Sequence, residues 1–318
     1  MKRPGFRFAR GLPCVLVVGG LSLGACPVLA QAPEGDDAEP DDVLVNDEVL
    51  AQLEEGEIPD LVFAWMVENP ASGITRVPVA NAVLIGVPPN DRVGYAFVLA
   101  PIIPILFKGG WSLITRTIIP AVVTVPVGDN RVTGFGDMSF EPLAHKLIRG
   151  RKGQLYDVSW GAFAGFPTAT DDFLGSGQWE LGPEVVLGVS GRRWVTILVA
   201  RNVWSVGDRN RPDVNELVLD SLLFYNLPKL FYLVYEPTIT ADWTADRGDR
   251  WTLPLGIGFG RHHRLPKRQR LSLTTRLSGF YNVVRTDRDP KASVLFTLVF
   301  WKPLPAVFIS DLALNGVG

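Results

Sequence analysis

Cysteine is nearly absent from this chain of 318 residues, which contains only Cys14 and Cys26. Both lie in a stretch that begins with basic residues, continues with an apolar run over residues 12–25 and ends in the small-residue sequence VLA at 28–30. These features are typical of a cleaved secretory signal peptide, to which we assign residues 1–30. Cleavage after Ala30 removes both cysteines, so the exported chain has no disulfide and depends on packing and backbone pairing for its stability.

Two other interpretations of this stretch were weighed. The sequence LGAC at 23–26 resembles the lipidation box of bacterial lipoproteins, and processing there would leave a lipidated Cys26 at the mature N-terminus. A retained membrane anchor is disfavoured, because several glycines and Pro27 leave no uninterrupted apolar helix of the roughly 20 residues that a bilayer requires. Cleavage after Ala30 is the preferred interpretation.

Long apolar runs are also missing from the rest of the chain. The most apolar stretches, residues 93–107 and 111–123, contain Pro101, Pro104 and Arg116, which excludes membrane-spanning helices there. The 32 glycines and 25 prolines are too many for a helical protein of this size, and they punctuate the chain regularly.

An excess of positive charge is missing as well. The chain has 31 Lys and Arg residues against 33 Asp and Glu residues, and four of the basic residues lie in the signal peptide. The 27 basic residues that remain leave a net charge of about −6 with neutral histidines. This balance argues against a nucleic-acid partner, because binding to phosphates requires an excess of basic side chains.

Residues 31–70 are expected to form an acidic leader and a short periplasmic or plugging segment. Residues 31–42 are acidic, contain prolines and show no apolar pattern, which predicts a disordered leader. Residues 43–68 have apolar side chains spaced for one or two short helices. Nothing later in the sequence predicts a helix.

From about residue 72 onward, segments of roughly 9 to 15 residues alternate between apolar and polar side chains, as the strands of membrane barrels do. Across residues 179–189 the apolar side chains share one face, whereas Glu180 and Glu184 share the opposite face. The same alternation occurs in residues 251–260. It indicates β-strands with one apolar and one polar face.

A soluble β-sandwich would show the same alternation, so the choice of fold rests on the tryptophans and the connections. Tryptophans cluster at the expected strand ends, where membrane barrels have their interfacial girdles. They are Trp111, Trp179, Trp194, Trp204, Trp243, Trp251 and Trp301. Short connections alternate with longer polar ones, which is the arrangement of outer-membrane barrels. The short ones span residues 107–111, 148–154, 190–193, 226–230 and 261–270, and the longer ones span 87–92, 126–137, 167–178, 205–215, 244–250 and 282–291.

These segments predict an all-β fold: a single antiparallel transmembrane β-barrel of about 12 strands over residues 71–301, preceded by a short helical or irregular segment and followed by a tail at 302–318. An even number of strands places both termini on the periplasmic side. Pro183, Pro237 and Pro254 fall inside expected strands, where each removes a ladder hydrogen bond, so we expect them at bulges or beyond the true strand limits.

Several long motifs follow one another in order through the chain. They are WSLITRTIIP at 111–120, GFGDMSF at 134–140, FPTATDDFLGSGQWELGP at 166–183, NVWSVGDRNRPDVN at 202–215 and WTLPLGIGFGR at 251–261, with a looser match in ENPASGITRVPV at 68–79. The chain thereby resembles a family of outer-membrane proteins described as transporters or as products linked to a meta-cleavage pathway of phenol degradation. The resemblance implies a barrel and traffic of small organic molecules, hydrophobic ones included. It implies no set of binding residues.

The C-terminal end departs from the usual outer-membrane pattern. The aromatic-rich segment SVLFTLVFW at 293–301 is followed by a tail up to Gly318, whereas the insertion machinery ordinarily meets a terminal aromatic residue.

Histidine is scarce, and catalytic motifs are absent. The chain contains only His145, His262 and His263, and it has no HExxH, paired CxxC, GxSxG or phosphate-binding loop. We expect His262 and His263 in a solvated periplasmic turn, and His145 has no nucleophile motif near it. The sequence therefore predicts no catalytic residue, no metal site and no cofactor. Oxygen-rich loops at 168–177 and 207–215 leave calcium binding as a hypothesis, beside plain solvation or cation bridges to lipopolysaccharide.

The polar faces of the strands supply the candidate lumen-lining residues. If the apolar faces meet lipid, charged side chains on the opposite faces point into the lumen, where they need water or ionic partners. A salt-bridged filling and a role in selectivity are both open interpretations. A barrel of about twelve strands lies between the filled eight-stranded barrels and the open porins, which predicts a narrow or plugged passage. The candidates are Arg116, Glu141, Glu180, Glu184, Glu216, Asp220, Glu236, Asp242 and Arg276.

The sequence thus predicts an exported outer-membrane β-barrel of a Gram-negative bacterium that acts as a passive channel or transporter for small, hydrophobic or aromatic organic molecules. Expected partners are outer-membrane lipid and lipopolysaccharide, the barrel-insertion machinery and a small-molecule solute. A non-conducting structural or adhesive barrel is the first alternative, and an outer-membrane lipid hydrolase is the second.

Overall fold

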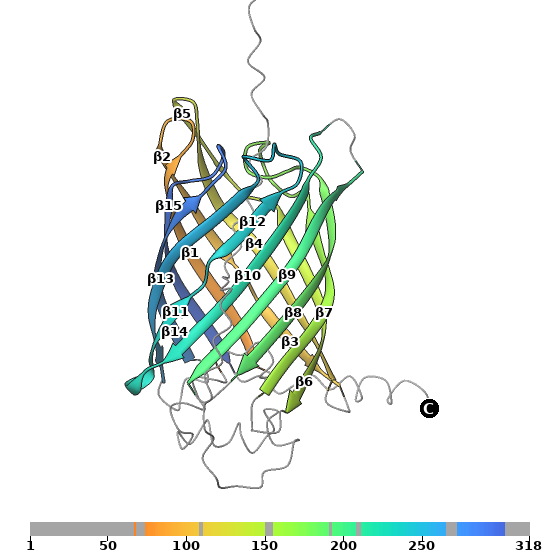
Figure 1. Ribbon diagram of the computed structural model, residues 1–318, viewed down its shortest axis with the longest axis vertical. Helices are drawn as coiled ribbons and strands as arrows, with labels where there is room; N and C mark the ends of the chain where they lie inside the picture. The colour runs from red at the N-terminus through yellow and green to blue at the C-terminus, as the bar shows by residue number, and fades with distance from the viewer. Residues whose placement is uncertain are drawn as a thin grey trace, which may run out of the picture.

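The chain folds as a closed antiparallel β-barrel (Figure 1). The computed structural model describes residues 67, 74–107, 111–149, 155–190, 193–207, 211–264 and 272–302. Fifteen β-segments form one sheet, and three of the barrel strands are each split into two segments, β2 with β3, β5 with β6 and β11 with β12. The barrel therefore has twelve strands, which confirms the fold predicted from the sequence.

The segments follow one another along the chain and around the barrel. Their bounds are β1 Thr75–Val87, β2 Arg92–Leu99, β3 Ile102–Leu106, β4 Trp111–Val127, β5 Asn130–Gly134, β6 Met138–Arg149, β7 Leu155–Phe166, β8 Trp179–Ser190, β9 Trp194–Val206, β10 Asn215–Asn226, β11 Phe231–Tyr235, β12 Thr238–Asp242, β13 Trp251–His263, β14 Ser272–Val284 and β15 Ala292–Lys302. Each strand pairs with the next, and β1 pairs with β15 from Thr75 opposite Lys302 to Ile85 opposite Ala292. Closure in this way removes the free sheet edges that an open sheet would expose.

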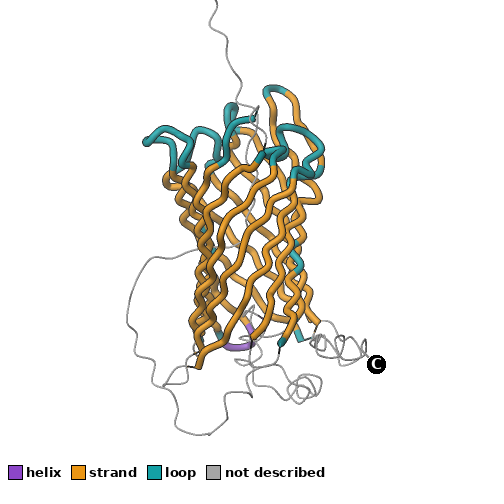
Figure 2. Tube along the Cα trace, turned by 90° about the vertical axis from the view of Figure 1, so that its right-hand side faces the viewer, coloured by secondary structure: helices purple, strands orange, loops and turns teal. Residues whose placement is uncertain are grey.

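The two ends of the barrel differ in their connections, as expected from the sequence. Figure 2 shows the longer loops gathered at one end, which we call the mouth. The opposite end has the short turns, including the single turn of 3-10 helix at Pro228–Leu230, and the last strand, β15, ends there.

One expected loop is largely strand. Residues 126–137 were predicted to be a long polar connection, but β4 continues to Val127 and β5 begins at Asn130. The two segments form a hairpin at the mouth because Val125 pairs with Val132 and Gly128, with a φ of 57°, makes the turn between them.

Alternating side chains face lipid and lumen, and β8 shows this most clearly. Trp179, Leu181 and Leu187 are 54%, 48% and 48% exposed on the outer face, whereas Glu180 and Glu184 are 7% and 1% exposed on the inner face. The side chains of this strand lie as the sequence alternation predicts. An apolar outer surface of this kind fits the hydrocarbon interior of a bilayer.

Aromatic side chains pair on the outer face at the strand ends. Trp111 packs edge-on against Trp160 with ring centroids 5.5 Å apart, and Trp243 packs in the same manner against Trp251 at 5.8 Å. Trp301 is an exception to the predicted girdle, because it is only 2% exposed. Its position opposite Arg76 in the β1–β15 register gives it the inward parity of that neighbour.

The three prolines that conflicted with the predicted strands lie at irregular points of the ladder. Pro237 lies in the break between β11 and β12. Pro254 lies at a register shift between β13 and β14. Pro183 belongs to β8, but the pairing of β8 with β9 skips it and Gly182. A residue without an amide hydrogen is tolerated at such points, because no ladder bond is lost there.

Most of the predicted segments before the barrel and the tail after Lys302 lie outside the described residues. The exception is Val67, which is helical in backbone, 4% exposed, and accepts a hydrogen bond of 2.7 Å from Nη1 of Arg76 on β1. Within the described ranges, no helix is long and apolar enough to cross a membrane.

Candidate functional site

The inner wall of the barrel has a ring of charged side chains near the middle of the strands. Arg116, Glu141, Glu184, Arg201 and Asp220 come from β4, β6, β8, β9 and β10, and we call them the charged belt. The strand register places them together, because Arg116 is the cross-strand partner of Glu141 and Glu184 is the partner of Arg201.

Ion pairs connect the charged belt across and around the lumen. Arg116 pairs through Nε with Glu141, and its Nη2 lies 3.5 Å from Oε1 of Glu184. Since β6 and β7 separate β4 from β8 in the sheet, the second pair crosses the interior. Arg201 pairs with Asp220 at 3.2 Å.

A second ion pair lies on the neighbouring wall. Arg276 on β14 pairs with Glu236 at 3.1 Å, and the hydroxyl of Ser278 donates a hydrogen bond of 2.6 Å to the same carboxylate. The guanidinium of Arg276 also lies 6.0 Å from the ring centre of Phe224. These contacts fix Arg276 in place, because a buried charge is tolerated only with partners.

Several buried polar atoms of the belt have no hydrogen-bond partner among the described residues. They include Oε2 of Glu184, Oδ1 of Asp220, Oε1 of Glu141 and two guanidinium nitrogens of Arg201. A buried polar atom without a partner costs about 1–3 kcal/mol. Water in the interior of the barrel would satisfy these atoms, as it does in a water-filled lumen.

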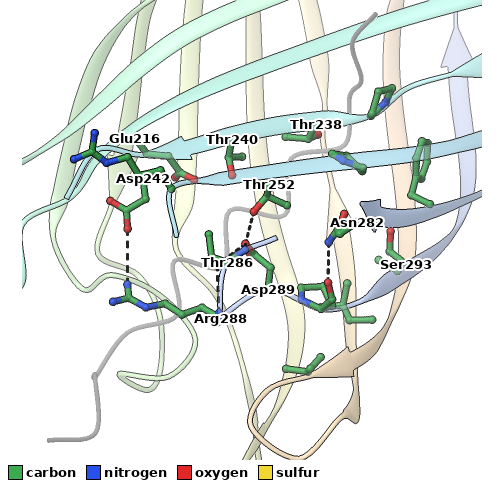
Figure 3. Close-up of a pocket in the computed structure, with 18 of the residues that line it drawn as sticks. Glu216, Thr238, Thr240, Asp242, Thr252, Asn282, Thr286, Arg288, Asp289 and Ser293 are labelled. Carbon is green, nitrogen blue, oxygen red and sulfur yellow. Dashed lines mark hydrogen bonds and ion pairs between the residues drawn. The ribbon is translucent and has the colours of Figure 1, made fainter. Parts of the chain in front are cut away.

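A cavity of about 210 Å³ lies between the charged belt and the mouth (Figure 3). We call it the mouth cavity. Its walls are rich in hydroxyl and charged side chains, with Leu84, Phe280 and Leu295 among the apolar residues. Its polar lining includes Glu216, Glu236, Thr238, Thr240, Asp242, Asp249, Arg250, Thr252, Asn282, Thr286, Arg288, Asp289 and Ser293.

Carboxylates dominate the electrostatics of the mouth cavity. Glu216 on β10 and Asp242 on β12 are direct cross-strand partners, an arrangement that is unfavourable for like charges. Arg288 of the β14–β15 loop lies 3.8 Å from Asp242 and offsets part of this repulsion (Figure 3). Asp289 accepts hydrogen bonds from the hydroxyls of Thr252 and Thr286, so the loop is tied to the barrel wall.

A second cavity, of about 160 Å³, lies between the charged belt and the short-turn end, and we call it the inner cavity. Its walls are largely aliphatic, with the aromatic rings of Phe224 and Tyr232. Tyr232 is accommodated because its neighbour on β13 is Gly260, where a Cβ atom would lie 2.3 Å from the Tyr232 ring. The aliphatic lining includes Ile102, Ile114, Leu143, Val186, Ile197, Val199, Leu222 and Val299.

A serine, a histidine and an aspartate form a hydrogen-bonded chain beside the inner cavity. Nδ1 of His145 lies 2.8 Å from the hydroxyl of Ser112, and Nε2 lies 3.3 Å from Oδ1 of Asp157. Adjacent strands position them, because Ser112 on β4 faces His145 on β6 and Asp157 follows on β7. His145 and Asp157 line the cavity, whereas Ser112 lies behind them.

The prediction that His262 lies in a solvated turn is wrong. Strand β13 continues through His263, which pairs with Leu273, so His262 has the inward parity of Gly258 and Gly260. It is 1% exposed, bonds to the hydroxyl of Thr274 at 2.8 Å and stacks on Tyr232 with ring centroids 4.7 Å apart. A polar ring is stable there because it is both hydrogen-bonded and stacked.

Strand parity places all nine sequence-predicted lumen residues on the inner side of the barrel, in four groups. Four belong to the charged belt: Arg116, Glu141, Glu184 and Asp220. Glu236 and Arg276 form the second ion pair. Glu216 and Asp242 line the mouth cavity, and Glu180 is buried near the start of β8 on the mouth side. That solutes pass these residues stays a prediction.

Sequence reasoning missed the interior residues Arg76, Asp157 and Arg201. Arg201 escaped notice because β9 is apolar on both faces, with Val199 inside and Leu198 outside, so no polar face marks the lumen. The outward tryptophans at the two ends of β9 would have identified its inward parity. Within the described ranges, no group of three or more His, Cys, Asp or Glu side chains is arranged to hold a metal ion.

Comparison with known proteins agrees with the fold. A family model described as "Putative MetA-pathway of phenol degradation" matches residues 96–279, more than half of the chain. The crystal structure of the COG4313 outer membrane channel from Pseudomonas putida F1 superposes with a TM-score of 0.54 at 14% identity, covering 72% of this chain and 95% of that one. The NanC porin gives a TM-score of 0.46 at 14% identity, covering 72% of this chain and 100% of that one. No curated sequence matches the chain.

Proposed function

The chain belongs to the MetA-pathway of phenol degradation family, and on that premise we propose that the protein is an outer-membrane channel for passive diffusion of small organic molecules. The observation that supports this most is the order of environments along one barrel. A mouth cavity with many charged and hydroxyl side chains is followed by the charged belt with its unsatisfied polar atoms and then by a mainly aliphatic inner cavity.

The lining of the inner cavity favours solutes that are small and mainly apolar, with one or two polar groups. Aliphatic walls and the rings of Phe224 and Tyr232 offer contact to an aromatic or aliphatic body. His145, His262 and Thr274 offer hydrogen-bonding groups at a few places. A phenol-like solute meets both requirements, and it is also the type of molecule that the family's description suggests.

Bilayer reconstitution tests the proposal. Purified protein in liposomes should speed the entry of small uncharged aromatic solutes over protein-free liposomes, and protein in planar bilayers should give a small ion conductance. Liposomes that contain the protein and remain as impermeable as protein-free ones would favour the non-conducting structural or adhesive barrel.

Location is tested separately from transport. We expect the protein in the outer-membrane fraction of a Gram-negative host, and we expect it to migrate differently on gels before and after boiling, because closed barrels resist detergent until heated. Recovery as a soluble periplasmic protein would contradict the outer-membrane location, and the channel function would fail with it.

A hydrolase remains the competing function, because Ser112, His145 and Asp157 form the chain of groups that acyl transfer uses. Two features disfavour it. Ser112 does not line the inner cavity, and it lies inside the β4–β6 ladder, where the pairing strands leave no free amides for an oxyanion hole. Labelling by a fluorophosphonate that disappears in Ser112→Ala would establish the hydrolase, whereas we expect no labelling.

A further inference from the structure

The loop between β7 and β8, residues 167–178, folds into the mouth of the barrel, and we call it the mouth loop. Leu174 is fully buried, with 0% exposure. It packs in one cluster with Ala80, Ala96 and Val125, which are inward-facing residues of β1, β2 and β4. Because β5 and β6 lie between these strands and β7, the loop must reach past one barrel strand on the inner side.

Asp137 fixes the mouth loop to the wall. Its carboxylate accepts hydrogen bonds from the amides of Ala169 and Gly177 at 2.8 and 3.1 Å, and from the hydroxyl of Ser176 at 3.3 Å. One side chain thereby holds both ends of the loop. Asp137 lies in the break between β5 and β6, so the interruption of this strand supplies the anchor.

Two threonines add to this attachment. The hydroxyl of Thr168 donates to the carbonyl of Gly136 and accepts from the amide of Met138, at 3.0 and 2.9 Å. Thr170 exchanges bonds of 3.0 Å with the backbone of Phe135 through its amide and its hydroxyl. The broken strand thus satisfies its free backbone groups with the loop.

A second anchor comes from the β9–β10 loop. Arg211 donates to the carbonyl of Ser176 at 3.2 Å and pairs with Asp172 at 3.0 Å. Gly177 has a φ of 62°, and a Cβ atom there would lie 2.3 Å from Nη1 of Arg211. The positive φ favours glycine at this position, and the absence of a side chain leaves room for the Arg211 guanidinium. The mouth loop is therefore held from two sides.

The barrel wall is shaped to receive the loop. Ala80, Ala82 and Ala96 line the wall at the cluster, and Gly134 lies where a Cβ atom would meet Leu174 at 2.8 Å and the Thr170 hydroxyl at 2.0 Å. The small residues on the wall and the large apolar residue on the loop are complementary in size, which indicates that the loop packs at this place in the folded protein.

We propose that the mouth loop, positioned by Asp137, is a fixed constriction that determines solute specificity, admitting small uncharged molecules and hindering hydrated ions. The proposal rests on the channel function. The loop occupies part of the barrel cross-section at the mouth, where Leu174 is buried in one cluster with the small wall residues and Phe173 packs against the same cluster. A narrowed passage hinders hydrated ions because they must shed water to enter it.

The matched variants are Asp137→Asn and Asp129→Asn. Both remove one negative charge at the mouth, but Asp129 lies exposed at the tip of the β4–β5 hairpin and away from the loop. Asp137→Asn replaces one acceptor oxygen by a donor, which opposes the loop amides. We expect ion conductance to rise about twofold or more in Asp137→Asn and to stay unchanged in Asp129→Asn.

A reversible cross-link tests whether loop position is the cause. A Cβ built on Gly134 lies 3.4 Å from Cβ of Thr170, which is close to the spacing of a disulfide. In the double variant Gly134→Cys and Thr170→Cys the closest contact of the new Cβ is removed, because the Thr170 hydroxyl is replaced, and only the end of the Leu174 side chain must shift. The pair should therefore oxidise, and the single variant Gly134→Cys should keep the original conductance as the control for that shift. Added to Asp137→Asn, the cross-link should return the conductance to its original value, and reduction should raise it again.

The possible results separate the position of the loop, its effect on ions and the channel function. Failure of the cysteines to cross-link would show that the mouth loop does not lie against Gly134 on the barrel wall. A formed cross-link together with unchanged conductance in Asp137→Asn would show that the loop does not limit ions, while the channel proposal stands. If neither protein passes ions or uncharged solutes although the cross-link forms, the channel function fails and the specificity role fails with it.

Discussion

The two cavities of the barrel share strands β1, β4, β10, β13, β14 and β15 and yet differ in chemistry. Carboxylates, hydroxyls and guanidinium groups stand among the apolar lining residues of the mouth cavity, whereas the inner cavity is lined mainly by aliphatic and aromatic side chains. Strand β10 shows the change within one element, from Glu216 near the mouth through Asp220 in the belt to Phe224 near the short turns. A solute would thus exchange water for apolar contact gradually, in steps set by the position along each strand.

The largest effect we expect concerns which cavity faces the cell exterior. Epitope tags inserted at Asp171 or Arg209 should be bound by antibody on intact cells, and a tag at Lys152 should not. The reason is that the longer loops of such barrels are extracellular. The measurement is antibody binding to whole and to permeabilised cells, and binding only to the Lys152 tag on whole cells would reverse the assignment of the two ends.

The next largest effect separates a buried ion pair from an exposed one. Arg116→Ala leaves the belt carboxylates Glu141 and Glu184 without their shared partner, which should cost about 3–5 kcal/mol of folding free energy. Arg288→Ala removes only a half-exposed partner of Asp242 in the mouth cavity and should cost about 0–1 kcal/mol. Denaturant titration of both variants in the same detergent gives the comparison.

Equal stability losses in the two variants would mean that the belt is as well solvated as the mouth. The charged belt and the mouth cavity would then differ in their lining side chains and not in how far their charges are exposed to water.

A smaller effect is expected on ion selectivity. Replacing Glu180 and Glu184 together by glutamine should lower the preference for cations over anions, because two negative charges leave the inner wall between mouth and belt. The change should shrink as salt rises. Reversal potentials in asymmetric salt measure it, and Asp213→Asn, an exposed loop residue, is the control for loss of a surface charge. An unchanged reversal potential in a conducting double variant would place these carboxylates off the ion path.

The smallest effect should come from the inner cavity. Phe224→Ala enlarges it where Tyr232 packs edge-on at 5.5 Å, so bulky uncharged aromatic solutes should enter liposomes faster while ion selectivity stays the same. Thr240→Ala in the mouth cavity should change neither. Loss of ion selectivity in Phe224→Ala would instead couple the two cavities.

The sequence predicted the barrel well because strand parity is a local property. Glu180 and Glu184 alternate with apolar neighbours, so the inner face of β8 was evident without the structure. Parity could not show which strands meet across the lumen. The pair between Arg116 and Glu184 joins β4 to β8, and it depends on closure and stagger of the whole sheet.

The inward side chain of Trp301 and the course of the mouth loop could not be predicted, because residue type and composition pointed to other positions. Trp301 resembles an interfacial tryptophan in type and position, but its parity turns it inward. The mouth loop is a polar, glycine-rich segment by composition, and only its contacts with Asp137 and the small wall residues reveal that it enters the barrel. Loop direction is set by tertiary contacts, which composition does not encode.

The seam between the first and last strands has a consequence for the order of assembly. Strand β1 must pair with β15, which places Thr75 opposite Lys302. The ion pair between Asp91 and Lys291 joins residues that are 200 positions apart in the chain. Every other strand pair is between near neighbours in sequence and can form as hairpins do. The seam is therefore expected to form last, and until then β1 and β15 expose their unpaired backbone groups to other chains. Protection of these two strands during biogenesis is what the barrel-insertion machinery would have to provide.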